Sequence, residues 1–402
     1  MREETFRYVL IGGGLAAANA VEGIRDIDRE GPILMICAEP RLPYNRPPLT
    51  KGLLLGKKRP EDIVCKPEEF YSKNQVRVLS GQIATRLNPS LRSVTLDNGA
   101  VIHFERLLLA TGCRARKLDL PGAHLDGIRT VRTLDDSLAL LQAMKEVHRA
   151  VVVGGSYIGA ETASSLAQNG IQTTVLFPEA RLLERLLDAE FGQHLHALFE
   201  KHGVVIRTGR KPVAFKGNTR VESVVTDRAE ELPAELFVLG VGAVLNDEMP
   251  RQAGLAMGEH GGVRVDERLQ TSAEGIYAAG DIADYPDPTF ERRFRLEHWD
   301  TAFRQGRTAG RNMAGAGESF AALPHYFSTL FDLGFSVWGD FSRWDKTLRK
   351  GELGRTGSWI FYLEKGRLCG VLAFDPVDKD QEHAIEHLVG QRLEETEIRR
   401  LT

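Results

Sequence analysis

Two strand–loop–helix units of the same pattern, far apart in the sequence, constrain the fold of this chain more than any other feature. In the first unit an apolar run meets Gly12, Gly13 and Gly14, and an Ala-rich stretch follows. In the second unit residues 151–153 are all Val, run into Gly154, and are followed by another stretch of small residues. Strands that are apolar on both faces are typical of parallel sheets covered by helices.

Each unit continues into a second apolar run that ends near an acidic residue. The run at 32–37 leads to Glu39, and the run at 172–177 leads to Glu179. In dinucleotide-binding folds an acid at this place accepts hydrogen bonds from a ribose hydroxyl. The repeat therefore predicts two such folds in a chain of 402 residues, a length that suggests two or three domains.

The glycine spacing in each loop supplies the chemistry for binding a pyrophosphate. Gly12 permits the tight turn, Gly14 lets the pyrophosphate approach the backbone, and Ala17 allows close contact between helix and strand. The helix that follows offers N–H groups and a partial positive charge. In the second loop Ser156 replaces the middle glycine of the motif, while Gly159 is its third glycine. The alternative to dinucleotide binding by this loop is a structural turn in a fold that has lost its ligand.

Parallel strands that alternate with helices indicate an α/β fold, and three other patterns predict further strands and a further helix. Residues 97–99, Asp-Asn-Gly, indicate a hairpin, and a buried strand at 107–109 follows it. In the tail, residues 357–374 are typical of two strands around a turn, and residues 381–401 are typical of a helix. We therefore expect two Rossmann-like domains and a C-terminal α+β domain.

Composition and charge narrow the class of protein. A formal net charge of -3 gives no reason to expect nucleic acid or an anionic membrane as a partner. The four cysteines form no closely spaced pair, so a metal site or a dithiol redox centre has no support. With no apolar run of membrane-spanning length and no secretory pattern, we expect a cytoplasmic protein, as a monomer or homodimer.

Four further stretches give the chain its resemblance to a known family. They are residues 42–54 (LPYNRPPLTKGLL), 107–116 (LLLATGCRAR), 275–283 (GIYAAGDIA) and 295–313 (RLEHWDTAFRQGRTAGRNM). With them the chain resembles the two-dinucleotide flavoprotein reductases. Within that group it is similar to NADH-dependent ferredoxin and rubredoxin reductases, apoptosis-inducing-factor-like proteins and monodehydroascorbate reductase. The resemblance covers residues 8–374 and implies non-covalent FAD in the first fold and NADH in the second.

The resemblance also implies a set of FAD contacts. Arg46 would neutralise the pyrophosphate, Lys51 would lie near flavin N5 and pair with an acid, and Asp281 would accept a hydrogen bond from a ribityl hydroxyl. A backbone N–H where the helix near residues 297–299 begins would bind flavin N1 or O2. The full expected FAD set is Gly12, Gly14, Ala17, Glu39, Arg46, Lys51, Thr111, Gly112, Arg116, Gly280, Asp281, Glu297, His298 and Trp299.

For the nicotinamide, the resemblance implies that Glu161 projects toward the ring and pairs with Lys51, which makes these two the expected catalytic residues. Glu179 favours NADH because it would repel a 2′-phosphate, although Arg181 and Arg185 lie close enough in sequence to reverse this preference. The full expected NAD set is Gly154, Ser156, Tyr157, Ile158, Gly159, Glu161, Glu179 and Gly242.

The electron acceptor is the part of the function that the sequence leaves open. Arg304, Arg307 and Arg311 recur at helical spacing and predict a basic face that could steer an acidic ferredoxin or rubredoxin-type carrier, unless they pair with acids of the same chain. Ferredoxin reductases typically carry Phe-Trp-Ser-Asp-Gln where residues 326–330 read Tyr-Phe-Ser-Thr-Leu. A reductase of a quinone or an organic radical, and a nucleotide-responsive flavoprotein with little turnover, are therefore the alternatives.

The domain boundaries follow from these motifs. We expect a discontinuous FAD domain at 1–113 and 243–321, an NAD(P)H domain at 114–242, and a C-terminal domain at 322–402.

Overall fold

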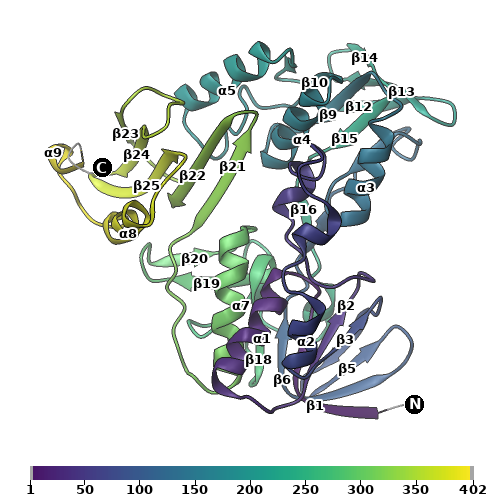
Figure 1. Ribbon diagram of the computed structural model, residues 1–402, viewed down its shortest axis with the longest axis vertical. Helices are drawn as coiled ribbons and strands as arrows, with labels where there is room; N and C mark the ends of the chain where they lie inside the picture. The colour runs from purple at the N-terminus through teal and green to yellow at the C-terminus, as the bar shows by residue number, and fades with distance from the viewer. Residues whose placement is uncertain (1–2, 399–402) are drawn as a thin grey trace. The chain divides into compact units, whose positions relative to one another are not determined.

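The computed structural model of the protein describes residues 3–398 (Figure 1). The chain forms two compact units, each assembled from three segments. The first unit consists of Met1–Asn45, Ile63–Arg114 and Leu245–His325. The second consists of Arg46–Asp62, Ala115–Val244 and Tyr326–Thr402. The division into three domains stays a prediction.

The first unit is built on a seven-stranded sheet, and its order confirms the predicted Rossmann-like pattern. β1 pairs in parallel with both β2 and β6, β3 extends the sheet beyond β2, and β18 pairs in parallel with β6. β4, β5 and β6 form antiparallel pairs, and the predicted hairpin joins β5 to β6. The strands are β1 (Glu3–Ile11), β2 (Ile33–Cys37), β3 (Val76–Ser80), β4 (Ala84–Asn88), β5 (Ser93–Leu96), β6 (Val101–Leu109) and β18 (Ile276–Ala278).

Two helices of this unit pack at backbone contact because glycines face backbone oxygens. In Figure 1 α1 (Leu15–Ile27) and α7 (Trp299–Met313) run beside each other. A Cβ on Gly306 would lie 2.2 Å from the carbonyl oxygen of Ala16, and one on Gly310 would lie 2.2 Å from that of Ala20. This close approach fixes α7 beside the first glycine loop.

Shorter elements complete the first unit. They are α2 (Glu68–Lys73), α6 (Glu248–Gln252), β17 (Val263–Arg264), η3 (Gly280–Ile282), β19 (Ala283–Asp287) and β20 (Arg292–Phe294). β7 (Cys113–Ala115) and β16 (Ala243–Leu245) form a two-stranded sheet, and the boundary between the two units falls within both strands.

The second unit repeats the parallel pattern in a five-stranded sheet of order β11-β10-β9-β15-β8. Its strands are β8 (Ile128–Thr130), β9 (Arg149–Val153), β10 (Gln172–Leu176), β11 (Val205–Arg207) and β15 (Leu236–Leu239). Its helices are α3 (Leu134–Ala143), α4 (Tyr157–Gln168) and α5 (Ala189–Lys201), with the one-turn helices η1 (Pro47–Thr50) and η2 (Pro60–Ile63) in or beside the 46–62 segment. An antiparallel sheet adds β12 (Pro212–Gly217), β13 (Val221–Thr226) and β14 (Glu231–Pro233).

The C-terminal segment forms a five-stranded sheet of order β21-β22-β25-β24-β23, which confirms the predicted hairpin between β24 and β25. The strands are β21 (His325–Leu330), β22 (Leu333–Gly339), β23 (Lys346–Lys350), β24 (Trp359–Glu364) and β25 (Arg367–Phe374). The helices are α8 (Lys379–Leu388) and α9 (Glu395–Ile398).

The prediction of one helix over residues 381–401 was wrong. α8 ends at Leu388, and Gly390 then takes a φ of 96° that a helix does not accept. The Gly390 N–H donates to the carbonyl oxygen of Leu368 at 2.7 Å. The backbone of Arg392 forms an isolated antiparallel β-bridge with that of Arg367. The chain therefore returns to the edge of β25 before the short α9, and residues 399–401 lie outside the described residues.

Candidate functional site

The first glycine loop joins β1 to α1 and leaves open space where the helix begins. Gly12 has a φ of 145°, and a Cβ there would lie 2.2 Å from the carbonyl oxygen of Ala110, so this turn requires glycine. A Cβ on Gly14 would meet no heavy atom within 4 Å, and Gly14 precedes α1 without a capping side chain. Open space beside the first N–H groups of a helix fits the pyrophosphate of a dinucleotide such as FAD.

Ala17 and Glu39 lie where the pattern predicts them. Ala17 is fully buried in the core around the sheet. Glu39 comes two residues after β2 ends, and its carboxylate accepts a hydrogen bond from the Tyr44 hydroxyl at 2.5 Å. This bond holds the carboxylate beyond the carboxyl end of a parallel strand, where the ribose of a bound dinucleotide is recognised.

The loop at Thr111 and Gly112 is held by reciprocal bonds to Asn246. The Thr111 hydroxyl donates to the carbonyl oxygen of Asn246 at 2.8 Å, and the Asn246 side chain donates to the carbonyl oxygen of Thr111 at 2.8 Å. Gly112 accepts from the Asn246 N–H at 3.0 Å and has a φ of 61°. The segment between β6 and β7 is therefore fixed to the segment that follows β16.

Gly280 and Asp281 begin η3, which is separated from β18 by Ala279. The Gly280 N–H donates to the side-chain oxygen of the buried Gln305 at 2.9 Å, which ties η3 to α7. The Asp281 carboxylate accepts a hydrogen bond from the Cys113 thiol at 3.1 Å. The role of Asp281 toward a ribityl hydroxyl stays a prediction.

Residues 297–299 lie where α7 begins, as predicted. His298 is the N-cap of α7, and burial lowers its pKa to about 4, so its ring is neutral near pH 7. The Glu297 carboxylate pairs with Arg295 at 2.8 Å, and the Trp299 indole N–H donates to the side-chain oxygen of Asn45 at 2.8 Å. His298 therefore brings no positive charge to the start of α7 near pH 7.

The second glycine loop keeps the turn geometry despite the serine. Gly154 has a φ of 123°, and a Cβ there would lie 2.1 Å from the carbonyl oxygen of Gly240. A Cβ on Gly159 would lie 2.0 Å from the carbonyl oxygen of Gly154, so this glycine brings the helix onto the loop. The exposed Ser156 precedes α4, and its hydroxyl donates to Gly240 at 3.3 Å rather than capping the helix.

The two residues after Ser156 differ in their surroundings. Ile158 is exposed, whereas the Tyr157 ring packs edge-on against Tyr326 with centroids 5.3 Å apart. Burial raises the pKa of the Tyr157 hydroxyl well above its usual value. Gly242 has a φ of 98° and accepts from the Arg116 N–H at 3.0 Å.

Two arginines were expected on FAD phosphates, and both belong to the second unit. The Arg46 guanidinium donates to the carbonyl oxygen of Arg132, and that of Arg116 donates to the carbonyl oxygen of Ala243 at 3.2 Å. Their contacts with FAD stay predictions.

Glu179 lies three residues beyond the end of β10 and is engaged in an ion pair. Its carboxylate is 2.6 Å from the Arg185 guanidinium, whose side chain is 80% exposed. The other nearby arginine, Arg181, pairs with Glu184 at 2.7 Å. Each arginine that could favour a 2′-phosphate is therefore compensated by an acid of the same loop.

The predicted pair of Lys51 and Glu161 is confirmed. The ammonium of Lys51 lies 2.8 Å from Glu161 Oε1, and the Glu161 residue is only 6% exposed. The Thr50 hydroxyl donates to Glu161 Oε2 at 2.5 Å, and the Ser328 hydroxyl donates to Oε1 at 2.6 Å. The Glu161 carboxylate thus accepts hydrogen bonds from two residues of the 46–62 segment and from one residue of β21. We call Lys51, Thr50, Glu161 and Ser328 the carboxylate cluster.

Polar residues of α4, together with its C-cap Asn169, hold the backbone around this cluster. The Ser165 hydroxyl donates to the carbonyl oxygen of Thr50 at 2.7 Å, and Asn169 donates to that of Leu54 at 3.1 Å. The Ser164 hydroxyl accepts from the N–H of Phe331 at 2.8 Å, just after β21. Lys51 is therefore held by its backbone as well as by its charge.

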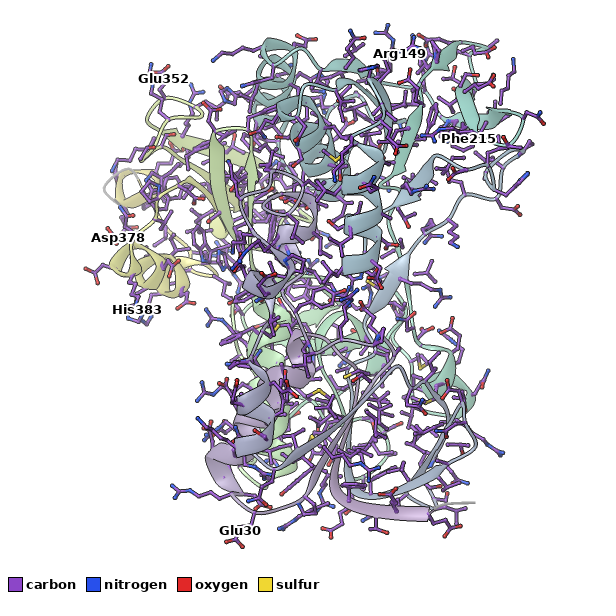
Figure 2. The ribbon with its side chains drawn as sticks, turned by 45° about the vertical axis from the view of Figure 1, so that its right-hand side comes forward. Glu30, Arg149, Phe215, Glu352, Asp378 and His383 are labelled. Carbon is purple, nitrogen blue, oxygen red and sulfur yellow. The ribbon has the colours of Figure 1, made fainter. Side chains whose placement is uncertain are left out.

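An ion pair near the surface lies where β9 begins, at the end of the strand away from the glycine loop. Arg149 begins the strand and is labelled in Figure 2. Its guanidinium lies 3.2 Å from Glu235, whose side chain is 37% exposed and also accepts hydrogen bonds from the N–H groups of His148 and Arg149. This pair is far less buried than the carboxylate cluster, which makes it a useful control.

The basic face predicted on α7 consists of ion pairs within the chain. Arg304 pairs with Asp300 of the same helix at 2.8 Å, and Arg307 pairs with Asp26 at 3.1 Å. Arg311 pairs with Asp26 at 3.1 Å and with Glu318 at 2.6 Å. The structure therefore shows the arrangement that the sequence left as the alternative, and docking of a carrier at these arginines stays a proposal.

The four cysteines are all free. Cys113 in β7 is buried and donates to Asp281, and the two in the strands β2 and β25, Cys37 and Cys369, are buried as well. Burial raises the pKa of each of these two thiols to about 12, so neither is a thiolate near pH 7. Within residues 3–398 no group of three or more His, Cys, Asp or Glu is arranged to hold a metal ion. No helix in that range has the length and apolarity needed to cross a membrane.

The sequence reasoning missed Asn246, and it included Thr50 and Ser328 only as members of motif stretches, without a role. Ser328 is fully buried on a strand, which gives no local signal because buried serines are often bound to the backbone. Asn246 follows β16 at a distant point of the chain from Thr111. Only the three-dimensional arrangement identifies these partners.

Comparison with known proteins gives a consistent result over most of the chain. Residues 6–306 match the family described as pyridine nucleotide-disulphide oxidoreductase. The ferredoxin reductase component of chlorobenzene dioxygenase from Cupriavidus sp. (strain PS12) is 32% identical over 366 residues, which cover 91% of this chain and 88% of that protein. Putidaredoxin reductase of Pseudomonas putida is 31% identical over 383 residues, which cover 93% of this chain and 89% of that protein.

Solved structures agree in fold. In the crystal structure of a covalent putidaredoxin reductase–putidaredoxin complex, the matching chain has a TM-score of 0.90 and 29% identity, with 95% of this chain and 93% of that chain covered. A ferredoxin reductase from Rhodopseudomonas palustris has a TM-score of 0.87 and 29% identity, with 91% of each chain covered.

Proposed function

The chain belongs to the pyridine nucleotide-disulphide oxidoreductase family, and we propose that it is an FAD-containing reductase that passes electrons from NADH to a ferredoxin- or rubredoxin-type carrier. The observation that carries the proposal is the repeated glycine loop: Gly14 faces open space before α1, and Gly154 and Gly159 keep the same turn before α4. Two pyrophosphate loops in one chain fit two dinucleotides.

The first loop would hold FAD. Gly12 and Gly14 would admit the pyrophosphate to the start of α1, and Glu39 would accept from the adenosine ribose. FAD, when bound, accepts a hydride and releases electrons singly, which links a two-electron donor to a one-electron carrier.

The second loop would hold the nicotinamide dinucleotide, with Glu179 favouring NADH. The buried Glu161 would orient the nicotinamide, and Lys51 would compensate its charge. Both residues act by position and charge, because hydride transfer itself requires no protein acid or base.

The acceptor is proposed from the relatives. Those named above are reductases of ferredoxin or putidaredoxin, and a rubredoxin-NAD(+) reductase of Pseudomonas putida is 30% identical over 339 residues. The family name includes disulphide reductases, but Cys37 and Cys369 are buried with raised pKa values, which favours an acceptor other than a protein dithiol. We propose, as the sequence led us to expect, that the reductase acts in the cytoplasm.

One observation favours a second candidate function. The arginines of α7 are compensated by Asp26, Asp300 and Glu318, which reduces the field available to steer an acidic protein. A small-molecule acceptor, such as a quinone or an organic radical, needs no such steering.

A comparison of acceptors tests the proposal. Purified protein would be supplied with NADH and, in parallel, with a [2Fe–2S] ferredoxin, a rubredoxin, a benzoquinone or monodehydroascorbate. We expect the highest kcat/KM with one of the two iron–sulfur carriers. A higher value with the quinone or the radical would replace the carrier by a small molecule, and no turnover with any acceptor would reject the reductase.

A further inference from the structure

We propose that Ser328 is a positioning residue of the nicotinamide site, which acts by holding the Glu161 carboxylate from the C-terminal sheet. The proposal rests on the proposed function, in which Glu161 orients the nicotinamide. It assigns to the C-terminal segment a part in the hydride-transfer step, in addition to any part in binding the electron acceptor.

The geometry of the carboxylate cluster carries the proposal. Glu161 Oε1 accepts from the Lys51 ammonium at 2.8 Å and from the Ser328 hydroxyl at 2.6 Å, while Oε2 accepts from Thr50 at 2.5 Å. The donors on Oε1 come from opposite ends of the chain, the 46–62 segment and β21. With both oxygens engaged, the carboxylate plane has one preferred orientation.

Burial makes the Ser328 hydroxyl difficult to replace. Ser328 is fully buried and Glu161 is 6% exposed, so water has little access to the oxygen that the hydroxyl serves. A buried carboxylate that loses a donor turns toward its remaining partners or draws in a water molecule. Either response would move the carboxylate and, with it, the ammonium of Lys51.

The strand that carries Ser328 is itself fixed on both sides. Two residues earlier, Tyr326 packs against Tyr157 of α4 with ring centroids 5.3 Å apart. Three residues later, the Phe331 N–H donates to Ser164 of α4 at 2.8 Å. The register of β21 against α4 is therefore set independently of Ser328, which leaves its hydroxyl to the carboxylate.

The direct test is Ser328→Ala in the FAD-containing protein. We expect the limiting rate of flavin reduction by NADH to fall by about three- to tenfold, the size expected for one buried hydrogen bond to a charged group. The dissociation constant for NADH should stay within about twofold, because the substitution leaves the loop at 154–159 unchanged. Ser328→Thr, which keeps a hydroxyl on a strand residue, should restore most of the rate.

A matched control removes a similar hydrogen bond elsewhere. Ser336 lies on β22, is largely buried, and donates to the carboxylate of Asp375 at 3.0 Å. Ser336→Ala should leave the rate of flavin reduction unchanged. If Ser328→Ala does not fold, the isosteric Ser328→Cys, a much weaker donor, replaces it with the same expected direction.

Two further measurements separate positioning from general packing. In a Glu161→Gln background, Ser328→Ala should cause no additional loss of rate, because the two residues would act as one unit. In the holoenzyme, acetylation of Lys51 measured by mass spectrometry should be faster in Ser328→Ala than in the wild type, and unchanged in Ser336→Ala. Equal losses of rate in both backgrounds, or wild-type acetylation and a wild-type rate in Ser328→Ala, would overturn the proposal.

The outcome also distinguishes this proposal from the proposed function. If Glu161→Gln is reduced as fast as the wild type, the role of Glu161 in the proposed function fails. If Glu161→Gln is slow and Ser328→Ala is not, only the role of Ser328 fails.

Discussion

The two strand–loop–helix units share a pattern but differ in the helix that follows the loop. α1 presents small apolar residues and packs against α7 at backbone contact, through Gly306 and Gly310. α4 carries Glu161, Ser164 and Ser165, and these bind the 46–62 segment and the C-terminal strand. Both helices are buried, but α1 packs through small apolar residues, whereas α4 binds two distant segments of the chain through polar side chains.

This difference shows what the repeat does and does not determine. In the proposed function, the strand and the glycines would set the place of a pyrophosphate in both copies, because Gly12 and Gly154 have the same kind of turn. The residues on the face of the helix determine what else the unit does. Substitutions at equivalent places should therefore have different consequences in the two copies.

The largest expected difference follows from Gly14→Val and Ser156→Val, which add the same side chain at the N-cap of each helix. Because a Cβ on Gly14 meets no protein atom, the first variant should fold, yet its side chain would occupy the place of the pyrophosphate. We expect FAD content to fall below about a tenth of the wild-type value. Flavin absorbance relative to protein absorbance measures this.

Ser156→Val is the matched control. It should keep its FAD and weaken the binding of NADH instead. Full FAD occupancy in Gly14→Val would show that the first loop does not hold this cofactor.

The next largest effect concerns the carboxylate cluster. We expect Glu161→Ala to slow flavin reduction by NADH by about ten- to a hundredfold, the loss expected for one preorganised polar contact, with FAD content unchanged. Glu235→Ala, which breaks the partly exposed ion pair with Arg149 where β9 begins, should leave the rate of flavin reduction unchanged. Stopped-flow absorbance measures both rates, and a normal rate in Glu161→Ala would give this residue a purely structural role.

A smaller effect concerns the choice between the two nicotinamide dinucleotides. The wild type should prefer NADH, and Glu179→Gln should release the exposed Arg185 to attract a 2′-phosphate. We expect the ratio of kcat/KM for NADH to that for NADPH to fall by about tenfold. Glu352→Gln, which frees the exposed Arg355 of the C-terminal segment, is the control and should leave the ratio unchanged. A wild-type preference for NADPH would contradict the assignment of Glu179.

The smallest effect is expected on α7. Arg304→Glu combined with Arg307→Glu reverses two charges that are already paired with Asp300 and Asp26. We expect reduction of an acidic ferredoxin at low salt to slow by about two- to fivefold, and the difference to vanish near 0.5 M salt. Identical rates at low salt, with flavin reduction intact, would place carrier docking away from α7.

The sequence predicted those features that depend on local pattern. The strand runs and glycine spacing predicted β1, α1, β9 and α4, and the Asp-Asn-Gly turn predicted the hairpin between β5 and β6. The same local signals failed at residues 389–394, where Gly390 ends a helical pattern that the surrounding residues continue.

The features that depend on distant partners needed the structure. The family resemblance predicted that Lys51 meets Glu161. The motif comparison at residues 326–330 includes Ser328 but gave it no partner, and Ser328 lies 167 residues from Glu161 in the sequence. The spacing of the arginines of α7 predicted a basic face. Their pairing with Asp26 could not be predicted, because Asp26 is 281 residues from Arg307 in the sequence. Charge compensation between such distant segments has no periodicity to reveal it.

Anaerobic stopped-flow mixing of the purified, FAD-containing protein with NADH tests the central claim most directly. If the two glycine loops hold FAD and a nicotinamide dinucleotide for hydride transfer, flavin absorbance near 450 nm should bleach within about a second, as expected for turnover of about 1 to 1,000 per second. NADPH should produce the same change more slowly. A flavin that stays oxidised with both dinucleotides, or a purified protein that contains no flavin, would contradict the account.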